Sequence, residues 1–149
     1  MAKELVLMWF RQDLRLSDNP ALISAANHGT VIPLYIFDDI NPGEYLMGAA
    51  SRCWLHHSLN SLNKSLNNRL LIKQGDPKSI LNELIEKYDI TAVYWNRCYQ
   101  PWQIQRDKEI KSSLQHQGVA VTTSNGSLLW EPWDNLKNDG TPYKVFTPF

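Results

Sequence analysis

The sequence lacks the features that mark several common classes of functional protein. It has only two cysteines, Cys53 and Cys98, and neither stands in a CxxC or Cys/His pattern, so a redox or zinc site of that kind is excluded and two buried thiols are expected. No apolar run approaches the roughly 20 residues that a membrane span needs. Neither GxGxxG nor GxxxxGK[ST] occurs, which excludes the common glycine-rich phosphate loops.

An excess of charge of either sign is also missing. The 149 residues hold 15 Lys and Arg against 15 Asp and Glu, so the chain as a whole has no basic footprint for nucleic acid. The length is enough for one domain, which buries roughly two-thirds of the surface of its unfolded chain. Lys3 and Glu4 lead directly into a strand-like stretch without a signal-peptide layout, so a cytoplasmic location is expected.

No arrangement of catalytic or metal-binding residues can be argued from the spacing. His56 and His57 are adjacent on a predicted helix, so they point in different directions and cannot form an i,i+4 metal pair. The sequence shows neither a Ser/His/Asp set nor paired carboxylates. We therefore expect no catalytic residue and no metal site in this chain.

What is present is a regular alternation of apolar runs and amphipathic stretches. Strands are predicted at residues 5–10, 31–37, 70–72, 91–96 and 119–121, where short apolar runs are bounded by polar residues. Pro33 suggests an edge, a bulge or an early position in the second of them. The pattern predicts an α/β fold, a Rossmann-like doubly wound five-stranded parallel sheet flanked by helices.

The intervening helices have clear signals. One begins at Pro20 behind a capping Asn19 and ends at His28-Gly29, and a weaker one runs from about residue 101 to 117. The helix over 51–67 has a stripe made of Leu55, Leu59, Leu62 and Leu66. Gly75-Asp76-Pro77 supplies a turn, a cap and a helix start. The helix that follows has an apolar face made of Ile80, Leu81, Leu84, Ile85 and Tyr88.

The alternation stops after Ser124. Residues 125–149 are rich in turn signals, which a compact domain rarely carries over such a length. We expect a domain at residues 1–124 and the start of a linker at 125–149. The aromatic side chains in this tail would expose apolar surface and promote self-association, and these are Trp130, Trp133, Phe146 and Phe149.

Charged residues follow the first strand, at the edge of the sheet where ligands of such folds bind. Arg11 and Arg15 alternate there with Asp13 and Asp18. The four side chains form a salt-bridged loop in one interpretation. In the other, the two arginines line a binding cleft, and spacing alone does not decide.

Two further groups lie at the same predicted edge. Asn96, Tyr99 and Trp102 follow the fourth strand and combine an amide with flat faces, which suits a planar heterocycle. The alternative is that Trp95 and Tyr99 are core residues and Trp102 covers a helix start. The second strand ends at Phe37, Asp38 and Asp39, and Arg52 begins the next helix, so these charges either orient a ligand or cap that helix.

One segment carries a specific family resemblance. Residues 9–19 read WFRQDLRLSDN, which resembles the WFRxDLRLxDN opening signature of the photolyase/cryptochrome family. Residues 48–59, 75–77 and 94–107 fit the same family in order. Residues 143–149 resemble the segment in which the polypeptide chain of family members leaves the N-terminal domain. The resemblance therefore covers the whole chain.

The resemblance implies a deoxyribodipyrimidine photo-lyase, a carbon–carbon lyase. The complete protein would bind FAD in a helical C-terminal domain absent from this chain, and would use blue light to split cyclobutane pyrimidine dimers in UV-damaged DNA. The N-terminal domain of such proteins carries a light-harvesting antenna, either methenyltetrahydrofolate or a deazaflavin. Energy transfer needs no covalent chemistry, so the isolated chain is not expected to be active.

The resemblance also implies an antenna site, which we assign to Arg11, Phe37, Asp38, Arg52, Asn96, Tyr99, Trp102 and Gln103. Gln103 replaces the glutamate that holds the pterin edge in folate-binding members, and an amide carries no charge. Three possibilities therefore stay open for the antenna: a folate, a deazaflavin, or no bound chromophore. A cryptochrome-type blue-light photoreceptor is the alternative function. A free-standing nucleotide-binding α/β module is the third, and the residue 9–19 signature argues against it.

Overall fold

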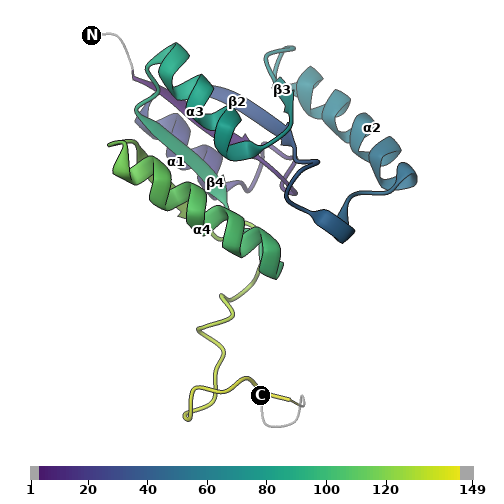
Figure 1. Ribbon diagram of the computed structural model, residues 1–149, viewed down its shortest axis with the longest axis vertical. Coiled ribbons are helices and arrows are strands. Elements are labelled where there is room, and N and C mark those ends of the chain that lie inside the picture. The colour runs from purple at the N-terminus through teal and green to yellow at the C-terminus, as the bar shows by residue number, and fades with distance from the viewer. Residues whose placement is uncertain (1–3, 145–149) are drawn as a thin grey trace.

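Five parallel strands form the sheet of the computed structural model, which describes residues 4–144. The strands are β1 (Leu5–Phe10), β2 (Thr30–Phe37), β3 (Leu71–Gln74), β4 (Ala92–Asn96) and β5 (Ala120–Ser124), in the order β3-β2-β1-β4-β5 (Figure 1). All four neighbouring pairs are parallel. This order reverses direction between β1 and β4, which is the topology of a doubly wound sheet. The predicted fold class is confirmed.

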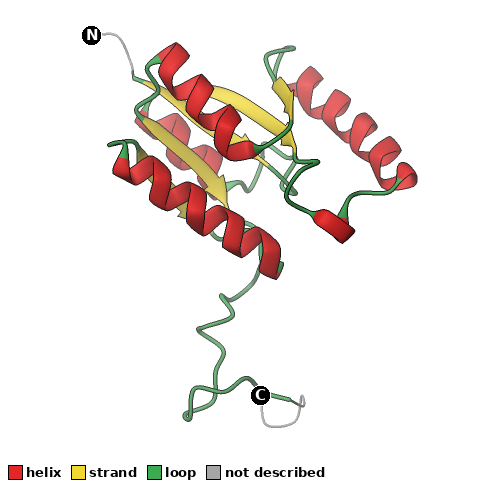
Figure 2. Cartoon of the chain, in the orientation of Figure 1, coloured by secondary structure: helices red, strands yellow, loops and turns green. Residues whose placement is uncertain are grey.

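Helices connect the strands and cover both faces of the sheet (Figure 2). They are α1 (Pro20–His28), the short 3₁₀ helix η1 (Gly43–Tyr45), α2 (Ala49–Ser65), α3 (Pro77–Tyr88) and α4 (Pro101–His116). The predicted caps are confirmed, because Asn19 accepts a hydrogen bond from the Leu22 amide and Asp76 accepts one from the Ser79 amide.

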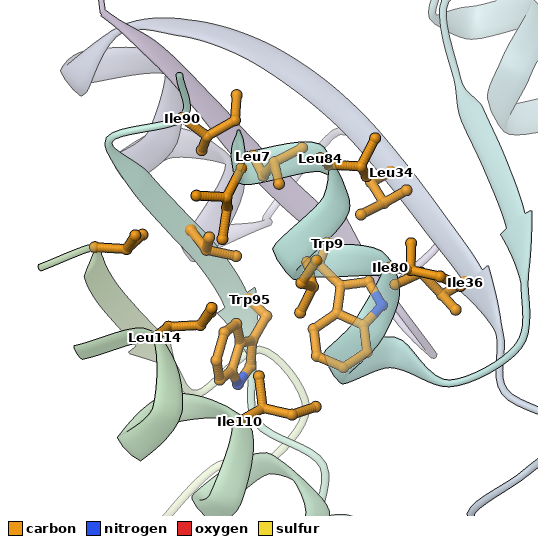
Figure 3. Close-up of a cluster of buried hydrophobic side chains, with 14 residues drawn as sticks. Leu7, Trp9, Leu34, Ile36, Ile80, Leu84, Ile90, Trp95, Ile110 and Leu114 are labelled. Carbon is orange, nitrogen blue, oxygen red and sulfur yellow. The ribbon is translucent and has the colours of Figure 1, made fainter. Parts of the chain in front are cut away.

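The strand residues alternate between two separate cores. Leu7 and Trp9 of β1 face α3 and α4, and Trp9 meets Trp95 of β4 edge to face with ring centroids 5.5 Å apart (Figure 3). Met8 and Phe10 face α1 and α2 on the other side. Helices on both faces explain why β1 and β4 are apolar at consecutive positions.

Three predictions about individual positions need correction or refinement. Cys98 is buried as expected, but Cys53 is exposed, because it lies on α2 away from the leucine stripe that packs on the sheet. Tyr88 is 40% exposed because it is the last residue of α3, beyond the packed part of that helix. Pro33 lies in an internal strand, but β2 pairs with β3 only from Leu34 onward, so its position is locally an edge.

The chain leaves the sheet after β5 and runs away from it (Figure 1). Between residues 125 and 144 there is no helix or strand beyond an isolated bridge of Leu136 with Pro142. Trp130 and Trp133 are 59% and 58% exposed. The other two aromatic residues predicted to be exposed in this tail, Phe146 and Phe149, lie outside the described residues.

Candidate functional site

A cavity of about 870 Å³ opens at the carboxyl ends of β1 and β2. Its walls come from the ends of these strands, the loop after β1, the segment before α2, one side of α2 and the first turns of α4. Small-molecule sites typically measure about 300–1,000 Å³. The lining residues are Trp9, Arg11, Gln12, Leu14, Arg15, Tyr35, Ile36, Phe37, Asp38, Pro42, Tyr45, Met47, Ser51, Trp54, Leu55, Ser58, Ser61, Gln100, Trp102, Gln103 and Arg106.

Charges of alternating sign form a network in the wall of this cavity. Asp107 bridges two arginines, accepting from Arg11 Nη1 at 2.7 Å and from Arg106 Nη2 at 2.8 Å. Arg106 Nη1 also donates to Asp38 Oδ2 at 3.0 Å. None of these four side chains is more than 12% exposed. Buried charges persist only when they are paired and hydrogen-bonded, so the network holds the arginines in fixed positions.

The same arginines stack on tryptophan rings. The Arg11 guanidinium carbon lies 4.6 Å from the Trp9 ring centroid, and that of Arg106 lies 5.2 Å from Trp9 and 5.1 Å from Trp102. The Trp102 indole donates to the Gln100 side chain at 3.0 Å. Trp102 thus covers the start of α4, as one sequence interpretation held, and also forms a flat wall of the cavity.

Asn96 lies behind the cavity rather than in its lining. Its amide nitrogen donates to Asp13 and, at 2.8 Å, to the Asn19 side chain, while its side-chain oxygen accepts from the Ala21 amide at 3.3 Å. Its backbone carbonyl accepts from Arg11. Asn96 therefore connects the loop after β1, the start of α1 and the end of β4.

Tyr99 and Arg52 also lie outside the cavity lining. The Tyr99 hydroxyl donates to Glu131 at 2.9 Å, and Glu131 is also paired with Arg97. Burial, together with the hydrogen bond to Glu131, raises the pKa of Tyr99. Tyr99 is thus not the core residue of one sequence interpretation, whereas Trp95 is, at 1% exposure. Arg52 is exposed on α2.

The structure corrects the salt-bridge interpretation of the loop after β1. The Asp13 carboxylate accepts from the backbone amide of Arg11, at 2.8 Å, and not from its guanidinium. Arg15 donates to the backbone carbonyl of Asp18. Both arginines line the cavity, which was the alternative interpretation.

The predicted capping of α2 by acidic side chains is also wrong. Asp38 accepts from the backbone amides of Ile40 and Asn41, at 3.1 and 2.9 Å, and so closes a local turn. The helix begins one residue after Gly48, without a side-chain cap.

Five of the eight sequence-predicted site residues thus line one cavity: Arg11, Phe37, Asp38, Trp102 and Gln103. Sequence reasoning missed Trp9, Tyr45, Trp54, Arg106 and Asp107. The signal for the last two was helical spacing, since Arg106 follows Trp102 by four positions and Asp107 follows Gln103 by four. No pattern marked Tyr45 and Trp54, which are 74% and 77% exposed at the cavity.

Three polar atoms among the lining residues are buried without a hydrogen-bond partner in the described chain. They are the Gln103 side-chain oxygen, the Trp9 indole nitrogen and the Arg11 Nε, and these residues are 7%, 1% and 9% exposed. An acceptor and two donors left unpaired in this way are costly unless another group satisfies them. Burial also raises the pKa of Tyr35 to about 12, so its hydroxyl stays neutral at the cavity wall.

Metal and membrane sites find no support in the described residues. Between residues 4 and 144, no group of three or more His, Cys, Asp or Glu side chains is placed to hold a metal ion. In the same part of the chain, none of the helices combines the length and apolar character needed to cross a bilayer.

Comparison with known proteins gives consistent matches. The sequence model of the DNA photolyase family matches residues 6–149. The chain is 44% identical to the deoxyribodipyrimidine photo-lyase of Agrobacterium fabrum over 97% of its own length and 30% of that protein. It is 37% identical to cryptochrome-2 of Arabidopsis thaliana, over 96% of this chain and 24% of that protein. The chain therefore spans less than a third of these relatives.

Solved structures agree in fold as well as in sequence. The class III photolyase of Agrobacterium tumefaciens superimposes with a TM-score of 0.89 at 42% identity, over 99% of this chain and 31% of that one. The photolyase of Sulfolobus tokodaii, solved with two FAD molecules and described as implying a novel light-harvesting cofactor, gives a TM-score of 0.69 at 27% identity, over 81% of this chain and 29% of that one.

Proposed function

The chain belongs to the DNA photolyase family, and from this premise we propose that it is the antenna domain of a deoxyribodipyrimidine photo-lyase. The observation that carries the proposal is the cavity at the carboxyl edge of the sheet, within a chain that matches the family from residue 6 to residue 149. The chain itself is not catalytic. Its role is to hold a planar light-harvesting chromophore close to the rest of the protein.

The cavity residues fit a flat heterocycle. Trp102 and the Arg106 guanidinium stacked against it offer a planar wall, and the ring of Phe37 also belongs to the lining. The unpaired oxygen of Gln103 and the unpaired nitrogen of Trp9 match the donors and acceptors on the edge of a pterin or flavin ring. When bound, such a chromophore supplies absorption of blue light. Asp38 and Arg11 hold the surrounding side chains in place.

The identity of the chromophore is part of the proposal. Methenyltetrahydrofolate and a deazaflavin are the two candidate chromophores. The third possibility is that the domain binds no antenna. Gln103 offers an amide where folate-binding members have a carboxylate, which favours a flavin-type ring. The relative from Sulfolobus tokodaii, solved with two FAD molecules, supports the same preference.

The complete protein is proposed to bind FAD in a further domain and to repair cyclobutane dimers in UV-damaged DNA, as the names of its photo-lyase relatives suggest. Residues 1–124 form the antenna domain and residues 125–149 begin the linker in this proposal. The tail exposes Trp130 and Trp133, so the isolated chain is expected to self-associate. A cytoplasmic location also stays a prediction.

A cryptochrome-type photoreceptor is the second candidate function. The similarity to cryptochrome-2 of Arabidopsis thaliana favours it, although at lower identity than the photo-lyase relative. Both candidates place a chromophore in the same cavity. They differ in whether the complete protein repairs DNA.

Equilibrium titration of the chain with methenyltetrahydrofolate and with riboflavin tests the antenna proposal. One of the two is expected to bind and to quench tryptophan fluorescence. Trp102→Ala should weaken binding by about tenfold or more, because base–aromatic and ring stacking contributes about 1–3 kcal/mol. Trp130→Ala, in the exposed tail, is the matched control and should change nothing. Binding of neither compound, or equal weakening by both variants, contradicts the proposal.

A further inference from the structure

Arg15 differs from the other two arginines of the cavity. Arg11 is paired with Asp107, and Arg106 is paired with Asp38 and Asp107. Within residues 4–144, no carboxylate is paired with Arg15. The lining thus contains three guanidinium groups, of which two are neutralised by buried carboxylates and one is not.

Backbone groups hold Arg15 in place without cancelling its charge. Its Nε and Nη2 donate to the carbonyl oxygen of Asp18 at 3.1 and 2.9 Å, and Nη2 also donates to that of Gly126. Carbonyl dipoles fix the orientation of a guanidinium but leave its positive charge. Within the described chain, the Nη1 group of Arg15 donates no hydrogen bond, so this end of the guanidinium is free to bind a ligand.

A fixed and uncompensated guanidinium is suited to an anion. Arginine binds phosphate and carboxylate oxygens through charge-assisted hydrogen bonds, and a side chain that is already ordered loses little entropy on binding. Arg15 is half-buried in the cavity lining, which also includes the exposed Gln12.

We propose that Arg15 anchors an anionic group, a phosphate or a carboxylate, on the side chain of the ligand whose ring occupies the cavity. The inference rests on the proposed function, because it assumes a planar ligand in that cavity. It adds that the ligand carries an anionic group attached to its ring system. It also assigns a binding role to a residue that lies outside the predicted ring site.

Riboflavin and FMN are a matched pair of probes, because they share one ring and differ by a phosphate. At low salt, the 149-residue chain is expected to bind FMN about tenfold more tightly than riboflavin, as one charge-assisted hydrogen bond allows. In Arg15→Gln the preference should fall to within about twofold, because the variant loses the charge that only FMN uses. Arg69→Gln removes the same charge from an exposed position outside the lining and should keep the preference.

Equal affinity of the wild-type chain for FMN and riboflavin overturns the inference, whatever the variant does. A preference that survives Arg15→Gln overturns it as well. If Arg15→Gln fails to fold, two other measurements test the inference. They are the preference of Arg15→Lys for FMN over riboflavin and the salt dependence of the same preference in the wild-type chain. A preference that depends on charge weakens as the salt concentration rises.

A probe without a ring separates this inference from the proposed function. Inorganic phosphate, titrated at constant ionic strength, is expected to give a saturable shift of the Arg15 Nε–H resonance in NMR spectra. If neither flavin binds but phosphate shifts Arg15, the antenna proposal fails for flavins and the anion site stands. If phosphate leaves the Arg15 resonance unchanged, the anion site is refuted.

Discussion

Removing the Asn96 side chain tests the connection between the loop after β1, α1 and β4. In Asn96→Ala, the Ala21 amide loses its side-chain acceptor and the Asp13 carboxylate loses a donor, and both residues are buried. Each buried polar group left unpaired costs about 1–3 kcal/mol. We expect the free energy of unfolding to fall by about 2–4 kcal/mol, a large part of the roughly 5–15 kcal/mol typical of a domain.

Urea denaturation followed by tryptophan fluorescence measures this loss, with the slope m checked for two-state behaviour. Asn27→Ala, at an exposed position of α1, is the control and should change stability by less than about 0.5 kcal/mol. Gly126→Ala should reproduce part of the effect, because a Cβ there would lie 2.5 Å from Asn96 Cγ. A loss below about 0.5 kcal/mol in Asn96→Ala would refute the role assigned to these hydrogen bonds.

Three further predictions concern other parts of the chain. Burial raises the pKa of Asp76, but the hydrogen bonds that its carboxylate accepts lower it below 3.8 overall. Asp76→Ala should therefore lower the free energy of unfolding by about 1 kcal/mol at neutral pH. This loss of stability should fade as the pH falls through the pKa of Asp76 in the folded protein. Cys53 should react with a thiol reagent within minutes, whereas Cys98, whose pKa is raised by burial, should react only on unfolding. Glu131→Gln should speed tryptic cleavage after Lys137, because it removes the ion pair that holds the tail.

Each of these has a clear contrary result. A deficit of Asp76→Ala that is independent of pH between about 7 and 3 would contradict the capping role of the carboxylate. Equal labelling rates of the two cysteines would contradict their assigned burial. Unchanged cleavage of Glu131→Gln, measured against cleavage of the rest of the chain, would show that the tail is held elsewhere.

Local patterns predicted the elements of this fold well. Asn19 and Asp76 mark helix starts through hydrogen bonds to residues three positions away, which are readable from the sequence. The consecutive apolar residues of β1 and β4 predicted strands buried on both faces, and the parallel sheet followed. Errors arose at element ends, as at Tyr88, where packing fades along an otherwise regular helix.

The partners of charged residues could not be predicted in the same way. Arg11 pairs with Asp107, 96 positions away, rather than with Asp13 two positions away, because the backbone turn after β1 aims its side chain under α4. Tyr99 similarly bonds Glu131 in the tail. Such pairings depend on where two distant segments meet, and a single sequence carries no local signal for that.

Light-dependent repair by the complete protein tests the central proposal most directly. The protein, loaded with FAD, is given an oligonucleotide containing a cyclobutane pyrimidine dimer, and the repaired strand is measured under blue light and in the dark. Repair only under blue light, with an action spectrum that follows the bound antenna, is the predicted result. Absence of repair by a flavin-loaded and photoreducible protein would contradict the photo-lyase function and favour the cryptochrome-type receptor.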